Sequence, residues 1–359
     1  MQKHYKVQAA AQLLDTTVDS VRRYVEDAGV SVERQEHGPR TRQFTIENVF
    51  DLAAWRQAHR PKVKVKKRAI ATIYAPKGGV GKTTITANLA CLFPLMGIRT
   101  LVIDLDFQAN LTLAFGYGSE LTMEEARETG VSPEQVVESH FGNLVPGWPG
   151  GRMALKDVLK KPFGESGPHL IPADLTLDRL DTILTYDALE GRKSDLKIAA
   201  LIQEGLSGKN SDFDLREYDL ILFDAAPAKN RMTRGALLAS DFVISPVSME
   251  KFSTKAISYL SSVLQDMHDA VGRSPELVVV GNFHTPNRLR VINQMAVLAK
   301  EYPGALLDTV IRRSEEFPKT LSEEDDLPPL ALAKPNCEAV EELRAVAKAL
   351  LVKLGVIDG

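Results

Sequence analysis

The feature that most constrains this chain is a glycine-rich loop at residues 75–84, with the sequence APKGGVGKTT. An apolar run at 69–74 precedes the loop, and a helical pattern follows it from Ile85 onward. A strand, a glycine-rich loop and a helix in this order form a phosphate-binding loop, because backbone N–H groups and the positive end of the helix point toward phosphate oxygens. We therefore predict a phosphate site here rather than a glycine-rich turn without a ligand.

Each position of this loop has an expected task. The glycines let the backbone turn its N–H groups inward, Lys82 would lie on the β- and γ-phosphates, and the hydroxyl of Thr83 would lie on Mg²⁺. The predicted nucleotide-binding residues of the loop are Gly78, Gly79, Val80, Gly81, Lys82, Thr83 and Thr84.

Two positions depart from the general P-loop. Pro76 replaces the first glycine, and an extra lysine, Lys77, opens the glycine run. The resulting sequence KGGVGKTT resembles the deviant Walker A motif of the ParA/MinD class of ATPases. The resemblance implies ATP or ADP and Mg²⁺ as cofactors and catalytic roles for Lys77 and Lys82. It also implies a homodimer in which Lys77 reaches the nucleotide of the partner subunit.

From residue 69 onward, apolar runs alternate with longer helical patterns. The predicted strands are 69–75, 99–104, 168–172, 219–224, 242–246 and 277–283. Continuous apolar runs are typical of a parallel sheet that is covered on both faces. The expected fold of residues 69–359 is therefore an α/β P-loop ATPase domain with a doubly wound, mostly parallel sheet and ligands at the carboxyl ends of the strands. Residues 115–167, rich in Gly, Pro and Glu, are predicted to be a variable insertion.

Two acids end the predicted strand 99–104. The sequence LVIDLDFQ at 101–108 resembles the Walker A′ motif of the same class (Asp-x-Asp-Pro-Gln), with Phe107 in place of the proline. The resemblance places Asp106 near the attacking water as a catalytic residue and Asp104 beside the metal. The alternative is that both acids cap the helix that follows.

A third acid, Asp224, ends the apolar strand 219–224, and this pattern is typical of a Walker B motif. Asp224 would hold Mg²⁺ through water, whereas the residues after it differ from the Pro-Pro-Ser-Leu-Gly of the ParA class. Asn282 follows another strand and is a candidate for the adenine edge, because an amide donates and accepts hydrogen bonds at once. A plain loop asparagine is the other interpretation, and the sequence leaves both open.

Residues 1–56 predict a compact helical module. Two amphipathic helices flank a turn at 15–17, residues 34–44 fit a β-hairpin wing, and Thr45 begins a further helix. This arrangement is a helix-turn-helix pattern and resembles a MerR-type winged helix. The predicted DNA-binding residues of this module are Arg22, Arg23, Arg40 and Arg42. A helical dimerisation arm whose arginines face solvent is the alternative.

Charge is distributed unevenly along the chain. Residues 1–68 carry 14 Lys and Arg against 8 Asp and Glu, a surplus of +6, so the remainder carries −9 of the net charge of −3. A basic first module suggests contact with nucleic acid. Residues 57–68 form a basic linker whose alternating Lys and Val fit either an edge strand or contact with DNA phosphates.

The C-terminal third contains further basic residues that would bind DNA without sequence preference, as in ParA-type proteins. The candidates are Arg312, Arg313 and Lys319, although nearby glutamates equally fit a mixed, solvated face. The last helical pattern, 338–354, starts with acidic residues. It therefore favours packing on the ATPase core over a membrane anchor, which would need a basic polar face.

The bulk composition is ordinary for a soluble globular protein, with 359 residues, 44% hydrophobic and 25% charged. No apolar run approaches the roughly 18 residues of a membrane span, and the only cysteines, Cys91 and Cys337, give no disulfide framework. We expect a cytoplasmic, nucleoid-associated protein.

The function implied by the resemblance is ATP-dependent DNA partition. The protein would dimerise on ATP, bind DNA nonspecifically, hydrolyse ATP with a ParB-like partner, and repress its operon through the first module. Two alternatives remain at this stage, an ATP-switched transcriptional regulator and a ParA-like ATPase that positions a protein cargo.

Overall fold

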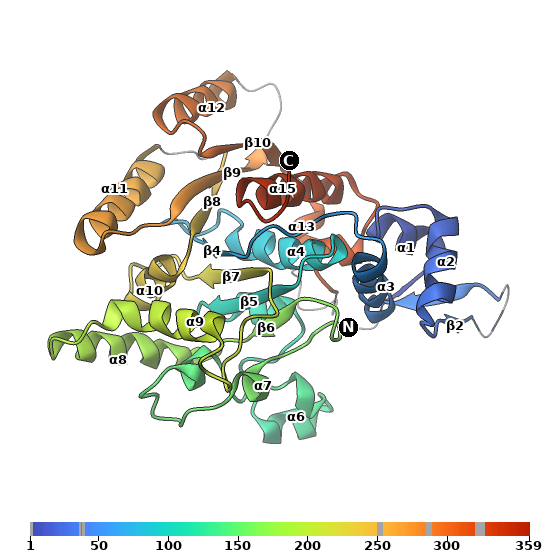
Figure 1. Ribbon diagram of the computed structural model, residues 1–359, viewed down its shortest axis with the longest axis horizontal. Helices are drawn as coiled ribbons and strands as arrows, with labels where there is room; N and C mark the ends of the chain where they lie inside the picture. Colours follow the sequence, from blue (N-terminus) through green and yellow to red (C-terminus); the bar gives the residue numbers. More distant parts are fainter. Residues whose placement is uncertain (1–2, 36, 38–39, 250–253, 285–288, 320–326) are drawn as a thin grey trace.

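The computed structural model describes residues 3–35, 37, 40–249, 254–284, 289–319 and 327–359. Its centre is a sheet with the strand order β10-β9-β8-β4-β7-β5-β6, in which every neighbouring pair is parallel (Figure 1). Within the described residues this sheet has seven strands, so the α/β doubly wound architecture expected of residues 69–359 is confirmed.

The strands lie close to their predicted positions. They are β4 Ala69–Ile73, β5 Thr100–Leu105, β6 His169–Ile171, β7 Leu220–Ala225, β8 Phe242–Ser248, β9 Glu276–His284 and β10 Leu306–Arg312. The sequence analysis missed β10. This strand lies at the edge of the sheet and buries only Leu307 and Ile311, so it lacks the continuous apolar run of the central strands.

Helices cover both faces of the sheet. One face carries α4 Lys82–Leu95, α14 Leu330–Ala333 and α15 Glu338–Lys353, which share one hydrophobic cluster with β4, β7 and β8. The other face carries α8 Asp178–Leu189, α9 Lys197–Ser207, α10 Arg231–Ala239 and α11 Thr254–Val271. The α12 helix, Leu289–Glu301, contributes Leu298 to a cluster with β9 and α11.

The predicted insertion at 115–167 folds into short elements below β5 and β6. They include α6 Met123–Thr129 and α7 Leu155–Val158. The helix α5 Asn110–Ala114 precedes them. Phe141 and Val158 bury their side chains in the cluster that β5 and β7 form, so this region is part of the core.

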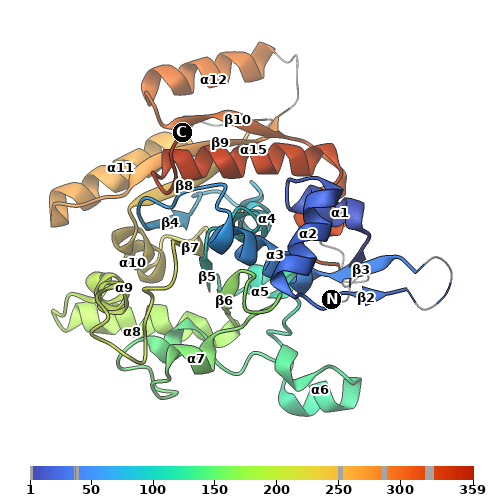
Figure 2. The same cartoon turned by 45° about the vertical axis from the view of Figure 1, so that its right-hand side comes forward.

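Residues 3–59 form the N-terminal module. It contains β1 His4–Tyr5, α1 Val7–Leu13, α2 Val18–Ala28, β2 Glu33–Arg34, β3 Arg42–Thr45 and α3 Ile46–His59. The strands β2 and β3 pair antiparallel and project away from the sheet, as Figure 2 shows, and β1 adds to β3. The helices and the hairpin strands lie where the sequence places them, and the hairpin tip includes residues 36, 38 and 39, which are outside the described part. The predicted boundary at residue 56 is wrong, because α3 continues to His59.

The N-terminal module and the ATPase domain share one hydrophobic cluster, to which α1, α3, α4 and α15 all contribute. The linker after α3 packs along this junction and contains no strand within 60–68, so the edge-strand interpretation is wrong. Its cations bind the protein itself. Lys62 contacts Asp15, Lys66 pairs with Asp358, and Arg68 binds the carbonyl of Tyr218 at 2.6 Å.

The apolar face of α15 is buried in this shared cluster, with Leu343 and Val346 fully covered. The prediction that the last helix packs on the core is therefore confirmed. Among the described helices, none combines the length and apolar character that a membrane crossing requires.

Candidate nucleotide-binding site

The predicted phosphate loop connects β4 to α4 at the carboxyl end of the central strand. Gly79 (φ 71°) and Gly81 (φ 85°) adopt left-handed backbone conformations, which side chains with a Cβ disfavour. Gly81 is the N-cap of α4, and its position leaves the first N–H groups of the helix directed at the loop. The local geometry is therefore that of an anion cradle.

The two lysines of the loop have opposite environments. Lys82 starts α4 and is buried, with 8% of its surface exposed. Lys77 is exposed, together with Gly78 and Gly79. A buried lysine serves the site of its own chain, whereas an exposed one at the loop surface is accessible to a second molecule.

The hydroxyl groups of α4 bind the carboxylate of Asp224. Thr83 donates to Oδ2 and Thr86 donates to Oδ1, both at 2.9 Å. Burial raises the pKa of Asp224, and the charge of Lys82 together with these two hydrogen bonds acts in the opposite direction. Thr83 and Asp224, each predicted to hold Mg²⁺, are thus in direct contact in the structure.

Asp104 lies beside Asp224 in the register of β5 and β7, but its carboxylate is turned to the protein. Oδ1 accepts from the backbone N–H of Asp106, and Oδ2 accepts from both the backbone and the hydroxyl of Thr112. Burial, reinforced by the charge of Asp224, raises the pKa of Asp104. Asp104 therefore holds the start of the segment after β5, and its predicted place beside the metal remains a prediction.

Asp106 sits at the next turn. One carboxylate oxygen accepts the backbone N–H of Gln108 at 3.1 Å, and the residue is 8% exposed. Within the described part of the chain, its other oxygen accepts no hydrogen bond. Its predicted role near the attacking water remains a prediction.

Asn282, at the carboxyl end of β9, holds the loop directly. Its side-chain amide donates to the carbonyl of Val80 at 2.8 Å, and its side-chain oxygen accepts the backbone N–H of Phe283. A Cβ added at Gly81 would lie 2.5 Å from the amide nitrogen of Asn282. The structure therefore engages both ends of this amide in the protein, and contact with an adenine edge remains a prediction.

A cavity of about 350 Å³ opens beside the loop, between β9 and the residues after β10. Gly79, Gly81 and Thr84 form its loop side, and Asn282 and Phe283 form its strand side. Because the cavity is continuous with the phosphate cradle, it is the space in this part of the structure where the remainder of a nucleotide fits.

The donor set around Thr83 and Asp224 fits Mg²⁺, which prefers oxygen ligands and keeps several waters instead of a full protein cage. No group of three or more His, Cys, Asp or Glu side chains within the described residues is arranged to hold a metal ion. A hydroxyl and one carboxylate next to a phosphate cradle agree with that small protein contribution.

The predicted DNA-binding residues divide into two groups. Arg22 and Arg23 are exposed on α2, Arg40 is exposed before β3, and Arg42 lies 3.7 Å from Glu26 of α2. Arg312 instead pairs with Glu338 and Glu342 of α15, and Arg313 lines the cavity beside the loop. Lys319 ends a short helix, α13 Glu316–Lys319, and its side chain lies outside the described part. Arg312 is therefore engaged in ion pairs with α15, whereas Arg313 is exposed, and the predicted contact of these residues with DNA remains a prediction.

Sequence reasoning missed three positions that organise the site. Thr86 binds Asp224, Thr112 binds Asp104, and Asn88 joins the backbone carbonyl of Thr84 to the backbone N–H of Ala331. Thr86 follows the loop by one helical turn from Lys82, and this spacing is the signal that points to it. Thr112 and Asn88 make contacts across the fold, for which the sequence carries no local signal.

The chain matches a family model described as an AAA domain over residues 67–277. It is similar to the chromosome-partitioning ATPase Soj of Thermus thermophilus, with 30% identity over 220 residues, which cover 61% of this chain and 69% of Soj. It is also similar to the cell division protein PomZ of Myxococcus xanthus, with 24% identity over 339 residues and 93% of each chain covered. The protein IncC of Escherichia coli is 27% identical over 327 residues, 91% of this chain and 76% of IncC.

Solved structures share the fold. A plasmid partition protein of Borrelia burgdorferi B31 bound to AMPPNP aligns with a TM-score of 0.57 and 21% identity, covering 80% of this chain and 100% of that one. The cobyrinic acid a,c-diamide synthase of Mycobacterium smegmatis with bound ATP analog and magnesium aligns with a TM-score of 0.58 and 18% identity, covering 80% and 95%. These two proteins differ in activity, so the structural likeness by itself establishes the fold alone.

Proposed function

Since this chain belongs to the ParA family of P-loop ATPases, we propose that it is a DNA partition ATPase whose ATP-bound form dimerises and binds DNA. The observation that carries the proposal is the contrast within one loop. Lys82 is buried against the site of its own chain, and Lys77 is exposed at the loop surface. In the proposed dimer, Lys77 contacts the nucleotide of the partner subunit.

The site residues have distinct roles in this proposal. The loop backbone and Lys82 hold the phosphates of ATP or ADP, and Thr83 and Asp224 hold Mg²⁺, which supplies charge neutralisation for phosphoryl transfer. Asp106, whose second carboxylate oxygen faces no described partner, orients the attacking water. Asp104 stabilises the segment that carries Asp106, because it accepts the backbone N–H of that residue.

The N-terminal module supplies a second DNA contact in the proposal. The exposed arginines Arg22, Arg23 and Arg40, together with the half-buried Arg42 of β3, bind an operator upstream of the gene as a winged helix-turn-helix does. A ParB-like protein stimulates hydrolysis and releases the ATPase from nonspecific DNA. These partners and the nucleoid association are proposed from the family.

The test measures binding to random DNA and to DNA upstream of the gene, with ATP, ADP or no nucleotide. We expect ATP to promote binding to random DNA, with affinity that falls steeply as salt rises. An Arg22→Ala/Arg23→Ala variant should lose the preference for upstream DNA. The matched control, Arg127→Ala/Arg152→Ala, removes the same charge from exposed positions of the insertion and should keep that preference. If neither DNA responds to nucleotide, the partition proposal is wrong.

A second candidate function is the positioning of a protein cargo. The similarity to the cell division protein PomZ, which covers 93% of both chains, favours it. Both candidates require nucleotide-dependent DNA binding, so the cellular readout separates them. Loss of plasmid or chromosome inheritance on deletion supports partition, and misplaced division with normal inheritance supports positioning.

A further inference from the structure

A single buried side chain links the N-terminal module to the helix of the nucleotide site. Arg56 of α3 is 3% exposed, and its two terminal nitrogens bind carbonyls of different elements. Nη1 donates to the carbonyl of Leu14, which caps the end of α1, and Nη2 donates to the carbonyl of Leu95 at 2.9 Å, the last residue of α4.

Burying the charged guanidinium of Arg56 costs free energy unless hydrogen bonds and opposite partial charges compensate for the lost water. Burial lowers the pKa of Arg56, and no carboxylate of the described residues lies within ion-pair distance of its guanidinium. Its Nε also has no hydrogen-bond partner among the described residues. The charge is compensated by the carboxyl ends of two helices, α1 and α4, whose dipoles both point their negative ends at it. Movement of either helix end therefore changes the environment of Arg56.

The two helices that Arg56 contacts belong to different parts of the molecule, the N-terminal module and the nucleotide site. The α4 helix begins at Lys82 in the phosphate loop and spans 14 residues, about 21 Å at 1.5 Å per residue, before it ends at Leu95. The α1 helix ends at the turn that leads into α2. Since a helix transmits displacement along its axis as a rigid element, α4 connects the loop to the α1–α2 turn through one guanidinium.

A second, half-buried arginine holds the same turn without a hydrogen bond to α4 in the described structure. Arg344 of α15 donates to the carbonyl of Leu13, the residue before the Arg56 contact, and burial lowers its pKa as well. The two arginines therefore share chemistry and target, although Arg344 is less buried, and of the two only Arg56 binds the end of α4 in the described structure. This pair provides a matched control.

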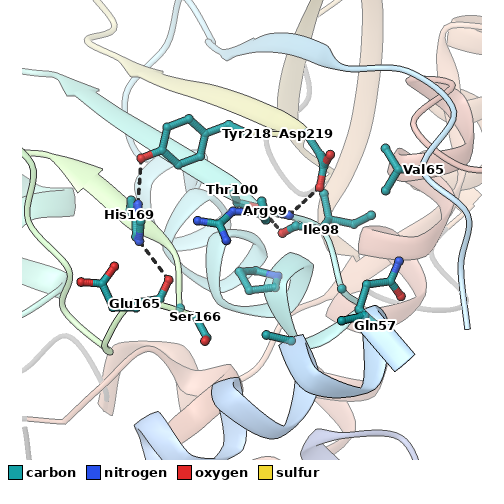
Figure 3. Close-up of a pocket in the computed structure, with 15 residues that line it drawn as sticks. Gln57, Val65, Ile98, Arg99, Thr100, Glu165, Ser166, His169, Tyr218 and Asp219 are labelled. Atoms are coloured by element: carbon teal, nitrogen blue, oxygen red, sulfur yellow. Dashed lines mark hydrogen bonds between the residues drawn. The ribbon is translucent and has the colours of Figure 1, made fainter. Parts of the chain in front are cut away.

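The seam beside Arg56 is incompletely packed. A cavity of about 290 Å³ lies between α3, the end of α4 and the amino ends of β5, β6 and β7. Gln57 of α3 and Ile98 after α4 line it, opposite His169 and Tyr218 (Figure 3). Space on this side allows α3 and the end of α4 to shift relative to each other without a steric clash.

We propose that Arg56 is a positioning residue that couples nucleotide binding at the phosphate loop to the α1–α2 segment of the N-terminal module. The inference rests on the proposed nucleotide site and adds to it a route by which the bound nucleotide changes the DNA-reading surface. Nucleotide orders the loop and α4, the end of α4 fixes Arg56, and Arg56 fixes the carbonyl end of α1.

Hydrogen–deuterium exchange of the full-length protein, with and without Mg·ADP, tests this route. In the wild type we expect slower exchange both in the phosphate loop and in residues 7–28, the latter by about fivefold or more. Protection of the loop without any change in 7–28 overturns the inference and leaves the proposed nucleotide site intact. Absence of protection at the loop overturns the proposed function, and the inference with it.

Variants separate the coupling of the two sites from a general loss of stability. The readout is the ratio of exchange rates with and without nucleotide, and a general loss of stability raises both rates. Arg56→Met should keep protection of the loop and lose the response of 7–28, whereas Arg344→Met should keep both. A response of 7–28 in Arg56→Met equal to that of the wild type, or its loss in Arg344→Met, overturns the inference. If Arg56→Met does not fold, Arg56→Lys decides, because lysine keeps the charge but not the fork of two donors. Its response in 7–28 should fall below half of the wild-type value, and a full response overturns the inference.

Discussion

The hydroxyl of Thr83 lies 2.9 Å from Oδ2 of Asp224, although 141 positions separate the two residues in the sequence. The contact forms because β4 and β7 are parallel neighbours. Asp224 lies near the carboxyl end of β7, and Thr83 lies in the first turn of α4, which the loop connects to the carboxyl end of β4. Thr86 occupies the other oxygen of the same carboxylate, so Asp224 is oriented before any metal binds.

The first prediction concerns this carboxylate. Asp224→Asn should reduce ATP hydrolysis by about 100-fold or more. The neutral amide attracts Mg²⁺ less strongly than the carboxylate does, and Mg²⁺ neutralises the negative charge of the phosphates. Release of inorganic phosphate at saturating Mg·ATP measures the effect. Asp212→Asn, an exposed change distant from the loop, should hydrolyse ATP at the wild-type rate. Near-normal hydrolysis by Asp224→Asn would remove Asp224 from the site.

The second prediction separates the two lysines of the loop. Lys82→Ala should abolish the rise in melting temperature caused by Mg·ATP, since it removes the buried cation that faces the phosphates. Lys77→Ala should keep that rise and lose ATP-driven dimerisation, measured by analytical ultracentrifugation. Lys209→Ala, an exposed lysine far from the loop, should dimerise normally. A Lys77→Ala protein that still pairs on ATP contradicts the proposed role across the dimer.

The third prediction concerns the amide that holds the loop. Asn282→Ala removes the hydrogen bond to the carbonyl of Val80, and we expect nucleotide affinity to fall about three- to tenfold. Isothermal titration with ADP and Mg²⁺ gives the dissociation constant. Gly81→Ala should cost more, because its φ of 85° is unfavourable for alanine and the new Cβ meets Asn282.

Asn336→Ala, at an exposed asparagine, is the control for the third prediction. If Asn282→Ala binds ADP as tightly as that control, the loop does not depend on this contact. A drop specific to adenine nucleotides, with inorganic pyrophosphate bound equally well, would instead support the predicted contact with the base.

The fourth prediction concerns acid stability. Burial lowers the pKa of His169, whose ring nitrogens contact the hydroxyl of Tyr218 and the carbonyl of Glu165. In the unfolded chain the imidazole titrates near its ordinary value of about 6.5. The unfolded state therefore binds a proton that the folded state does not, and the free energy of unfolding falls as pH drops below about 6.5.

Urea unfolding at pH 7.5 and pH 5.5 tests the fourth prediction. The loss of stability between these two values should be smaller in His169→Gln than in the wild type, whatever the stability of the variant at pH 7.5. His59→Gln, at an exposed histidine, should lose as much as the wild type. An equal loss in His169→Gln would show that this imidazole does not contribute to acid sensitivity.

Local patterns allowed much of the fold to be predicted. The central strands are continuous apolar runs with both faces buried, so their positions could be read from the sequence, as could the helix that ends at Gly29 with φ 65°. The edge strand β10 was not predicted because only Leu307 and Ile311 of its seven residues are buried. The module boundary predicted at residue 56 falls inside α3, because the helix continues through polar residues up to His59.

Site residues were predictable from the sequence where a short local motif identifies them. The loop, Asp106 and Asp224 belong to this group. The orientation of a carboxylate depends on which donors the fold brings to it, so sequence could not show that Asp104 turns toward Thr112. For the same reason, the sequence could not show the hydrogen bond from Asn282 to the carbonyl of Val80. It also could not show that Arg56 links the ends of two helices.

The hydrophobic cluster shared by the N-terminal module and the ATPase domain has a consequence for unfolding. Because α1, α3, α4 and α15 bury their side chains in one another, neither part has a complete interior alone. The two parts should melt in one calorimetric transition. A chain shortened to begin at residue 69 would leave the apolar surfaces of α4 and α15 in water, so it should aggregate instead of behaving as an independent enzyme. Exchange of the N-terminal module between related proteins would therefore require matching substitutions on both sides of its junction with α4 and α15.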